Sequence, residues 1–555
     1  MTDPLGGLTQ FTYDENGNLK TVADAKGNPP TTYDYDNMDR LQTRTDPLLK
    51  PESYEYDLAG NLRKFTDRKL QATNYIYDAL NRRTRATYAD LSTTDYVYDK
   101  GNRLLQVNDS ISGLITRGYD GLDRLTSETT PQGSVSYTYD KAGRRTTMTV
   151  GGQPTVNYAY DDMNRLTQIT QGSSIVSFTY DDASRRDTLT LPNGVLVDYD
   201  YDNASRVTKI TYKKGATVLG DLTYTFDKAG DRAQVGGTFA RTGIPQALST
   251  ATFNVANRQT NHTYDNNGNL TGITDASGTT LYTWNARNQL TGISGGVTAN
   301  FVYDGLGRRE KKTINSNLTE FLYDGVNPVQ ETSGATVLAN ILPGLETDEF
   351  LARTDIAAGT TSHLLPDALG SAVALADSAG TVQTEYTYEP FGQTTVTGAS
   401  NTNPFQYTGR ENDATGLYYY RARYYHPGIQ RFTSEDPILQ PANILALSST
   451  PQNLHPYAYA VNSPLNFSDP LGLSPECREA AWRWYRNCVA GVRSAVAACT
   501  ATCIIIGMAN PVAGIACGIA CGVYGIAASQ LCERGLDRLL KRCEEPDPCN
   551  RGPTS

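Results

Sequence analysis

A Tyr-Asp dipeptide recurs along the first 330 residues, at steps of 20 to 22 residues in its clearest copies, and this spacing restricts the possible folds more than any other feature. A fixed period of this length indicates a repeat architecture in which each unit is one supersecondary element. Clear copies come first, and looser copies follow them. The clear copies begin at Tyr13, Tyr35, Tyr56, Tyr77, Tyr98, Tyr119, Tyr139, Tyr160, Tyr180 and Tyr201, and the looser ones at Phe226, Tyr264, Trp284, Tyr303 and Tyr323.

The typical unit has the sequence order of a β-hairpin. Tyr137 and Tyr139 lie on one strand face, a short turn follows, and a strand rich in Thr and Val returns. Asp140 can accept hydrogen bonds from the turn amides, and Gly143 can adopt a positive φ. Because Lys, Gly, Asn and Asp all follow the Asp, we interpret the dipeptide as a turn device rather than a sugar or calcium site. Successive hairpins should pair, so we expect residues 8–470 to form a curled antiparallel sheet with a concave inner face.

Composition agrees with a mainly β fold and argues against nucleic-acid binding. Tyr occurs 36 times, against 13 Phe and 3 Trp, which suits sheet faces whose hydroxyls reach polar groups or water. The formal net charge of −10 makes general binding to nucleic acid unexpected. The first seven residues have neither a basic n-region nor an apolar h-region, so they show no cleavable secretion signal.

All nine cysteines lie in the last 79 residues, and eight of them are arranged as a mirror image about Asn510. Their spacings of 4 and 11 residues are close to one and three turns of an α-helix, so each set of four falls on one stripe. If the chain folds back at residues 507–514, the two stripes face each other in a small all-α hairpin. The predicted disulfides are Cys503–Cys517, Cys499–Cys521, Cys488–Cys532 and Cys477–Cys543, with Cys549 left as a free thiol or an intermolecular link.

Small side chains around these cysteines make such a disulfide ladder possible. Disulfides need Cα atoms about 4.4–6.8 Å apart, whereas helices usually pack at about 8–10 Å, and the Ala- and Gly-rich segments permit the closer approach. Buried free thiols and a thiolate metal site are the alternatives, although the tail contains no histidine. Disulfides form in oxidising compartments. We therefore expect a secreted or cell-surface protein, exported without a cleavable N-terminal signal.

The repeats resemble the Tyr-Asp (YD) repeats of the Rhs family, which includes bacterial polymorphic toxins, the C components of insecticidal toxin complexes and teneurins. Later blocks are similar to the Rhs-associated core, and they span residues 365–380, 386–392, 404–411, 416–425, 431–437 and 462–473. The resemblance implies a hollow, cocoon-like shell of YD repeats over residues 1–335 and a core domain over residues 336–473 that plugs one end. A variable C-terminal domain, here residues 474–555, would follow.

In the toxin branches of this family the tail is released inside the shell by an aspartate-dependent self-cleavage. The resemblance assigns Asp436 and Asp469 as the two carboxylates, Arg431 as the nearby arginine, and the bond between Leu473 and Ser474 as the cleaved one. Two neighbouring carboxylates can share one proton, so that one acts as base towards a water and the other as acid towards the leaving amide. This aspartyl-type self-cleavage is the one enzymatic activity that we predict, with no cofactor and no metal.

Our preferred functional hypothesis is a toxin-type delivery protein whose shell encloses its own C-terminal hairpin as cargo. Residues 494–532 contain no charged side chain, so the released hairpin could be membrane-active or bind a partner. Each half of the hairpin is nevertheless shorter than the roughly 20 residues that cross a bilayer. An immunity protein and a target-cell membrane are the expected partners besides the tail. The alternative is an extracellular or cell-surface structural protein in which the stapled hairpin is an interaction module.

Peptide mapping of exported protein under non-reducing conditions should recover disulfides whose two residue numbers sum to 1020. Closing a loop of about 15 residues stabilises a fold by roughly 3 kcal/mol, so the oxidised tail should resist heat and protease and loosen on reduction. Cys549 should stay outside the ladder, because its mirror position is Leu471. Any other pairing, or eight reactive thiols, would refute the hairpin.

Overall fold

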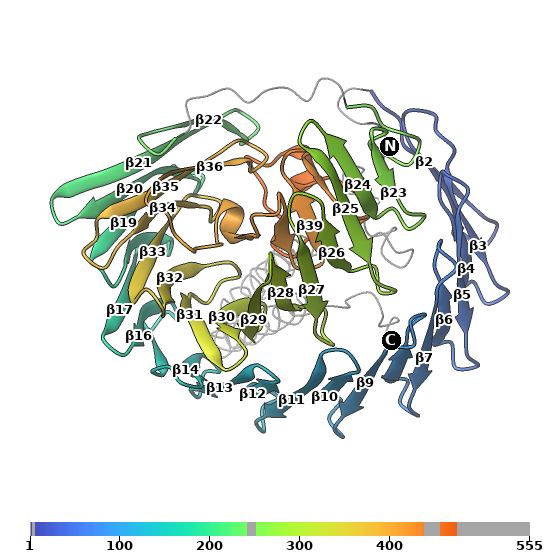
Figure 1. Cartoon of the computed structure of the whole chain (residues 1–555), viewed down its shortest axis with the longest axis horizontal. Helices are drawn as coiled ribbons and strands as arrows, with labels where there is room; N and C mark the ends of the chain where they lie inside the picture. The colour runs from blue at the N-terminus through green and yellow to red at the C-terminus, as the bar shows by residue number, and fades with distance from the viewer. Residues whose placement is uncertain (1, 3–5, 241–250, 438–454, 474–555) are drawn as a thin grey trace, which may run out of the picture.

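The structure is a computed structural model that describes residues 2, 6–240, 251–437 and 455–473. The predicted hairpin, with its disulfides and Cys549, falls on residues 474–555 and lies outside the described residues, as does Ser474. Within the described part, the regular structure is antiparallel β-strand apart from short 3-10 turns. The expectation of a curled antiparallel fold over the Tyr-Asp repeats is confirmed for these residues (Figure 1).

The first sheet has 22 strands, and each strand pairs antiparallel with the next one along the chain. Its strands are β1 (Gln10–Tyr13), β2 (Leu19–Ala23), β3 (Thr31–Tyr35), β4 (Leu41–Thr45), β5 (Pro51–Tyr56), β6 (Leu62–Thr66), β7 (Ala72–Tyr77), β8 (Arg83–Thr87), β9 (Thr93–Tyr98), β10 (Leu104–Asp109), β11 (Gly113–Tyr119), β12 (Leu125–Thr130), β13 (Gly133–Tyr139), β14 (Arg145–Val150), β15 (Val156–Tyr160), β16 (Leu166–Gln171), β17 (Ser174–Tyr180), β18 (Arg186–Thr190), β19 (Val195–Tyr201), β20 (Val207–Lys214), β21 (Thr217–Phe226) and β22 (Arg232–Gly236).

The second sheet has 14 strands, paired in the same consecutive way. They are β23 (His262–Tyr264), β24 (Leu270–Asp275), β25 (Gly278–Trp284), β26 (Leu290–Ser294), β27 (Ala299–Tyr303), β28 (Arg309–Ile314), β29 (Asn317–Asp324), β30 (Asn327–Ser333), β31 (Thr336–Pro343), β32 (Phe350–Asp355), β33 (Thr360–Pro366), β34 (Ala372–Ala376), β35 (Val382–Tyr388) and β36 (Thr394–Gly398). The predicted domain boundary after residue 335 falls between β30 and β31, and the sheet continues across it.

A four-stranded sheet completes the described structure. It contains β37 (Glu411–Asn412), β38 (Tyr418–Tyr420), β39 (Arg423–His426) and β40 (Arg431–Phe432), with 3-10 turns at η1 (Tyr407–Gly409) and η4 (Ala460–Asn462). This small sheet lies inside the curve of the two large ones (Figure 1). It is densely aromatic, and the rings of Tyr420, Tyr425, Phe432 and Tyr459 pack against one another.

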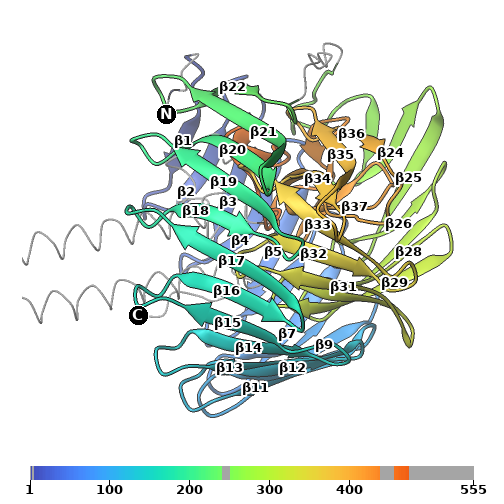
Figure 2. The same cartoon turned by 90° about the vertical axis from the view of Figure 1, so that its left-hand side faces the viewer.

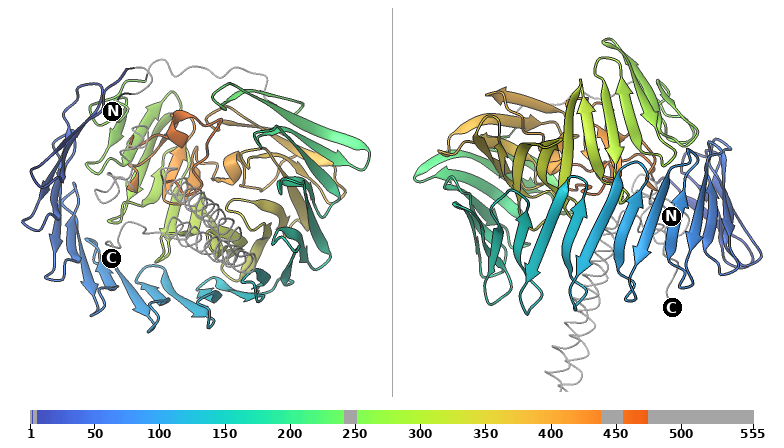
Figure 3. Two further views of the ribbon diagram at one scale, coloured as in Figure 1. Left: turned by 180° about the vertical axis from the view of Figure 1, so that it is seen from behind. Right: turned by 60° about the horizontal axis from the view of Figure 1, so that its bottom comes forward.

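The two large sheets follow each other as successive turns of a spiral. The first curls around the periphery, and the second is displaced along the spiral axis (Figure 2; Figure 3, right). Where the turns meet, residues 163 to 200 positions apart bind each other: Arg186 with Glu349, Arg308 with Glu128, and Asn267 with Asp67. One turn of the spiral therefore takes about as many residues as eight to ten hairpins of the repeat.

The main apolar core lies between the turns. Alternate residues of the first-sheet strands are buried, such as Val135 and Tyr137 in β13, as expected for strands with one covered face. They pack against second-sheet residues that include Leu322, Val329 and Leu365. The concave face of the first sheet is thus covered along β13–β21 by the second sheet.

The Tyr-Asp turn has the structural role that the sequence indicates. One carboxylate oxygen of Asp140 accepts hydrogen bonds from the amides of Ala142 and Arg144, and the other accepts one from the Arg144 side chain. Gly143 has a φ of +87°. In other repeats Asn, Asp or Ser takes this left-handed position, which suits short polar side chains better than branched ones.

Most Tyr-Asp units are also bonded to the units on either side of them. The hydroxyl of Tyr139 donates to the carbonyl oxygen of Leu125 in the preceding repeat, at 2.7 Å. The guanidinium of Arg144 lies 4.8 Å from the ring of Tyr160 in the following repeat. The same hydroxyl-to-carbonyl bond recurs at Tyr35, Tyr56, Tyr77, Tyr119, Tyr160, Tyr180, Tyr201, Trp284 (through its indole N–H), Tyr303 and Tyr323.

Replacing Tyr139 with Phe should lower the free energy of local opening at β12–β13 by about 1 kcal/mol, because the Leu125 carbonyl loses its side-chain donor. Hydrogen exchange of peptides from these strands measures the change. Tyr13→Phe is the matched control, since Tyr13 holds the same position in the first repeat and is half-exposed. Equal effects from both substitutions would contradict the proposed role of the hydroxyl.

Candidate self-cleavage site

The two aspartates assigned to self-cleavage converge in the folded core. Asp436 follows β40, and its amide donates to the Pro456 carbonyl at 2.9 Å. Asp469 begins a turn in which the amide of Gly472 donates to its carbonyl oxygen. Both side chains are buried, with 7% and 2% of their surface exposed. Residues 438–454, which separate the two segments, lie outside the described part of the chain.

Arg423, the first residue of β39, joins the two carboxylates. Its Nη2 lies 2.8 Å from Asp436 Oδ2 and 3.2 Å from Asp469 Oδ2. Its Nε donates to the carbonyl oxygen of Gly472, and its guanidinium stacks 3.5 Å from the ring centre of Phe432. One arginine therefore holds both acids and the backbone just before the predicted cleavage point.

Asp469 also contacts the residue on the N-terminal side of the predicted cleavage point. The amide of Leu473 donates to Asp469 Oδ1 at 2.9 Å. Leu473 is the last residue that the structure describes, so one partner of the predicted bond is bound directly to a candidate catalytic carboxylate.

Burial raises the pKa of Asp469 to about 7, with Arg423 opposing the shift and the negative charge of Asp436 adding to it. A buried acid beside another acid prefers its neutral form. Near neutral pH this site can therefore hold one proton on Asp469 while Asp436 is ion-paired with Arg423. That division of roles is the one that an acid and a base in a single reaction require.

Arg431, the arginine assigned from the family resemblance, lies elsewhere. Its Nη1 is 3.4 Å from His455 Nε2, and its guanidinium lies 5.2 Å from the ring centre of Phe253. In the described residues its side chain forms an ion pair with neither Asp436 nor Asp469, and Arg423 occupies the position expected for it. Strand alternation would place Arg421 and Arg423 on the same face, so the sequence does not reveal which of them faces the acids; in the structure a turn between β38 and β39 separates them.

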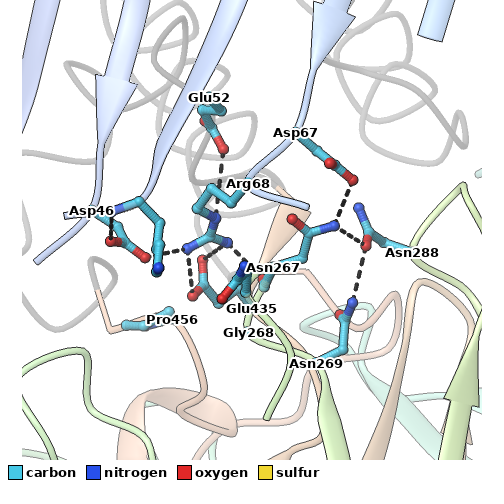
Figure 4. A network of polar contacts seen from close by, with 12 residues as sticks. Asp46, Glu52, Asp67, Arg68, Asn267, Gly268, Asn269, Asn288, Glu435 and Pro456 are labelled. Carbon is cyan, nitrogen blue, oxygen red and sulfur yellow. Dashed lines mark hydrogen bonds and ion pairs between the residues drawn. The ribbon is translucent and has the colours of Figure 1, made fainter. Parts of the chain in front are cut away.

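A second polar cluster, which sequence reasoning missed, adjoins the site. We call Glu435, Arg68 and Arg258 the Glu435 cluster. Arg68 bonds to both carboxylate oxygens of Glu435 at 2.7 and 3.0 Å, and Arg258 bonds to one at 3.1 Å. Figure 4 shows Arg68 reaching Glu435 from the first sheet, beside the bonded pair Asp67 and Asn267. No local pattern could have indicated it, because Arg68 and Glu435 are 367 residues apart.

In the described ranges no helix is both long and apolar enough to cross a membrane. Those ranges also hold no group of three or more His, Cys, Asp or Glu side chains placed to bind a metal ion.

Family models identify the repeat architecture. The model described as Teneurin YD-shell matches residues 98–227 and 197–465, and the one described as RHS Repeat matches residues 1–29 and 13–48. The chain belongs to the YD-shell family. The Teneurin YD-shell matches take in most of the first sheet, the second sheet and Arg423, with Asp436 included and Asp469 just beyond them.

Relatives of this YD-shell protein include toxins. The tRNA3(Ser)-specific nuclease WapA of Bacillus spizizenii is 33% identical over 266 residues, which cover 45% of this chain and 11% of that protein. Double-stranded DNA deaminase toxin A of Burkholderia cenocepacia is 29% identical over 248 residues, which cover 38% of this chain and 17% of that protein. Salivary gland surface protein 1 of Aedes aegypti is 42% identical over 97 residues, covering 17% and 2%. The chain spans less than a fifth of each.

Solved toxin structures share the fold. The crystal structure of TcdB2-TccC3 has a TM-score of 0.58 at 19% identity, covering 84% of this chain and 32% of that one. The Tc holotoxin pore of Photorhabdus luminescens, with a substituted TccC3, has a TM-score of 0.59 at 19% identity, covering 86% and 31%. At this level of identity the likeness shows that the curled shell is shared.

Replacing Arg423 with Met should destabilise this YD-shell protein by about 3–5 kcal/mol, since two buried carboxylates lose their cation. Without Arg423 the folded-state pKa values of Asp436 and Asp469 rise. The loss of stability should therefore grow between pH 7 and pH 9, as the two acids are forced to ionise in the folded protein. Chemical denaturation at both pH values measures it. Arg431→Met is the control, and its effect should not grow over this range. The same pH dependence in both variants would contradict the assignment of Arg423.

Proposed function

We propose that this YD-shell protein encloses its own C-terminal segment and releases it by cutting the bond between Leu473 and Ser474. The observation that carries the proposal is the convergence of Asp436 and Asp469 on Arg423, with the Leu473 amide bonded to Asp469. Asp-Pro sequences are common in turns, but a turn does not require two buried acids on one arginine. The arrangement supports an aspartyl-type self-cleavage that uses no cofactor.

In the proposed reaction Asp436 acts as the base and Asp469 as the acid. Ionised Asp436 takes a proton from a water molecule, whose oxygen attacks the Leu473 carbonyl carbon. Protonated Asp469 gives its proton to the Ser474 nitrogen as the carbon–nitrogen bond breaks. The products are a carboxylate at Leu473 and an amine at Ser474. Arg423 balances the charge of Asp436 and, through the Gly472 carbonyl, keeps the segment in place.

The released segment, residues 474–555, is the proposed effector. Two relatives carry toxin activities in their names, a tRNA nuclease and a DNA deaminase, which supports a delivery role for the shell that this chain shares with them. The mirrored cysteines and the uncharged stretch favour a disulfide-stapled helical hairpin that acts on a membrane or on a partner protein. The proposed partners are the enclosed tail, an immunity protein and the target-cell membrane, with secretion or surface display before delivery.

A second candidate function is an extracellular or cell-surface interaction protein in which the hairpin stays attached. The similarity to Salivary gland surface protein 1 of Aedes aegypti favours it, because that protein is named for a surface location. The two candidates differ in whether the tail leaves the shell. Exported protein that keeps its tail covalently attached would favour the second.

Intact mass spectrometry of the full chain should show conversion of the 60.5 kDa species into fragments ending at Leu473 and starting at Ser474. Asp436→Asn or Asp469→Asn should slow it by about 10²–10⁴-fold, because each removes the acid or the base. In wild-type protein the rate should fall as pH rises through about 7, where Asp469 loses the proton it donates. Asp377→Asn, in a turn of the second sheet, is the control. Wild-type protein that stays at 60.5 kDa at every pH would refute self-cleavage.

A further inference from the structure

Glu435 and Asp436 are neighbours in sequence, and their side chains serve two different clusters. The Glu435 carboxylate lies 2.7 Å from Arg68 Nη2, while the Asp436 carboxylate lies 2.8 Å from Arg423 Nη2. The backbone between them is also held, because the Asp436 amide donates to the Pro456 carbonyl at 2.9 Å, and only one peptide unit separates the two side chains. A contact that fixes Glu435 therefore also fixes the direction of Asp436.

Arg68 comes from the first turn of the spiral. It lies in the turn between β6 and β7, pairs with Asp46 at 2.9 Å and donates to the Asn267 carbonyl at 2.6 Å (Figure 4). Asn267 belongs to the turn between β23 and β24, at the start of the second sheet. The Arg68 guanidinium thus touches the first sheet, the second sheet and the segment that leads into Asp436. These bonds exist together only when the first turn lies against the rest of the shell.

The Glu435 cluster is charged at every pH at which cleavage is expected. The surrounding protein opposes ionisation of Glu435, but Arg68 and Arg258 lower the pKa of Glu435 to about 2. Arg68 is itself buried, with 7% of its surface exposed. An ion pair of this kind is costly to break from one side only, because the remaining charge stays buried. Glu435 is therefore held firmly as long as Arg68 is in place.

We propose that Arg68 is a positioning residue for self-cleavage, and that through Glu435 it makes the placement of Asp436 depend on closure of the first turn of the spiral. This inference rests on the proposed self-cleavage. In the part of the chain that the structure describes, Arg68 contacts neither Asp436 nor Asp469, so its effect passes through the Glu435–Asp436 backbone. The device would keep the tail attached until the shell has assembled, so that cargo is not released from an open shell.

The first arm of the test measures the cleavage rate of the full chain by intact mass. Arg68→Ala and Glu435→Gln should each slow cleavage by about tenfold to a hundredfold, as expected when a catalytic group is displaced by about 1 Å. Arg68→Lys should recover part of the rate, because it keeps the charge but not the forked geometry. Arg63→Ala is the matched control: Arg63 lies on β6 and forms an exposed pair with Glu55. It should cleave at the wild-type rate.

The second arm measures hydrogen exchange at the Asp436 amide and does not depend on cleavage. Arg68→Ala should speed this exchange by at least about tenfold, because one side of a buried ion pair is lost. Arg63→Ala should leave it unchanged. The full chain carrying Asp469→Asn serves as background, so that no cut occurs during the measurement.

The outcomes separate the two proposals. If wild-type protein never cleaves, the proposed function fails, and the exchange arm alone decides whether Arg68 holds Asp436. If the Asp436 amide exchanges as slowly in Arg68→Ala as in wild-type protein, the inference is overturned. This holds even when cleavage of Arg68→Ala is slower, because the effect would not pass through Asp436. If Arg68→Ala loosens the whole fold, shown by faster exchange in β13–β21, Glu435→Gln decides, since it keeps the shape of the side chain. Wild-type cleavage in Glu435→Gln overturns the inference as well.

Discussion

The shell depends on the hydrogen bond from most repeat tyrosines to a backbone carbonyl of the preceding repeat. A lone β-hairpin buries too little apolar surface to be stable, so each unit must be held in register by its neighbours. The hydroxyl sets the position of a unit relative to the unit before it. Where the turn carries an arginine, that arginine covers the aromatic ring of the unit after, as Arg144 covers Tyr160. Repeating one offset accumulates the natural twist of a sheet. The curl is therefore a consequence of contacts between adjacent units.

Contacts between adjacent units cannot set how one turn of the spiral sits on the next. The position of one spiral turn on the next is specified by buried ion pairs between the two large sheets, such as Arg308 with Glu128 and Arg287 with Asp109. A buried charge without its partner costs several kcal/mol, so a shift of the second turn by one hairpin would leave many charges unpaired. Apolar burial is less selective, because hydrophobic residues of similar size can often replace one another in a core. Polar pairs thus set the register between the two spiral turns, and apolar burial stabilises their contact.

The difference between contacts within neighbouring repeats and contacts between spiral turns explains which features could be predicted from the sequence. The hairpins, the role of Asp140 and the curled sheet depend on residues within about 20 positions of one another, and the structure confirms them for the described residues. The site was only partly accessible, because the family resemblance located Asp436 and Asp469 but pointed to Arg431. Which arginine reaches the acids depends on how β39 and β40 pair and on where residues 469–473 return. Neither property leaves a local pattern in the sequence.

The number of cations bonded to a buried carboxylate distinguishes the proposed reactive acid from the proposed anchor. Glu435 and Asp469 are both surrounded by protein, yet the pKa of Glu435 falls to about 2 and that of Asp469 rises to about 7. Glu435 is bonded to two cations, Arg68 and Arg258, both of which also contact Asp46, whereas Asp469 shares the single cation Arg423 with Asp436. One cation between two buried acids leaves one of them neutral and able to give up a proton. Two cations bonded to one carboxylate keep it charged, which suits an anchor and would prevent it from acting as an acid.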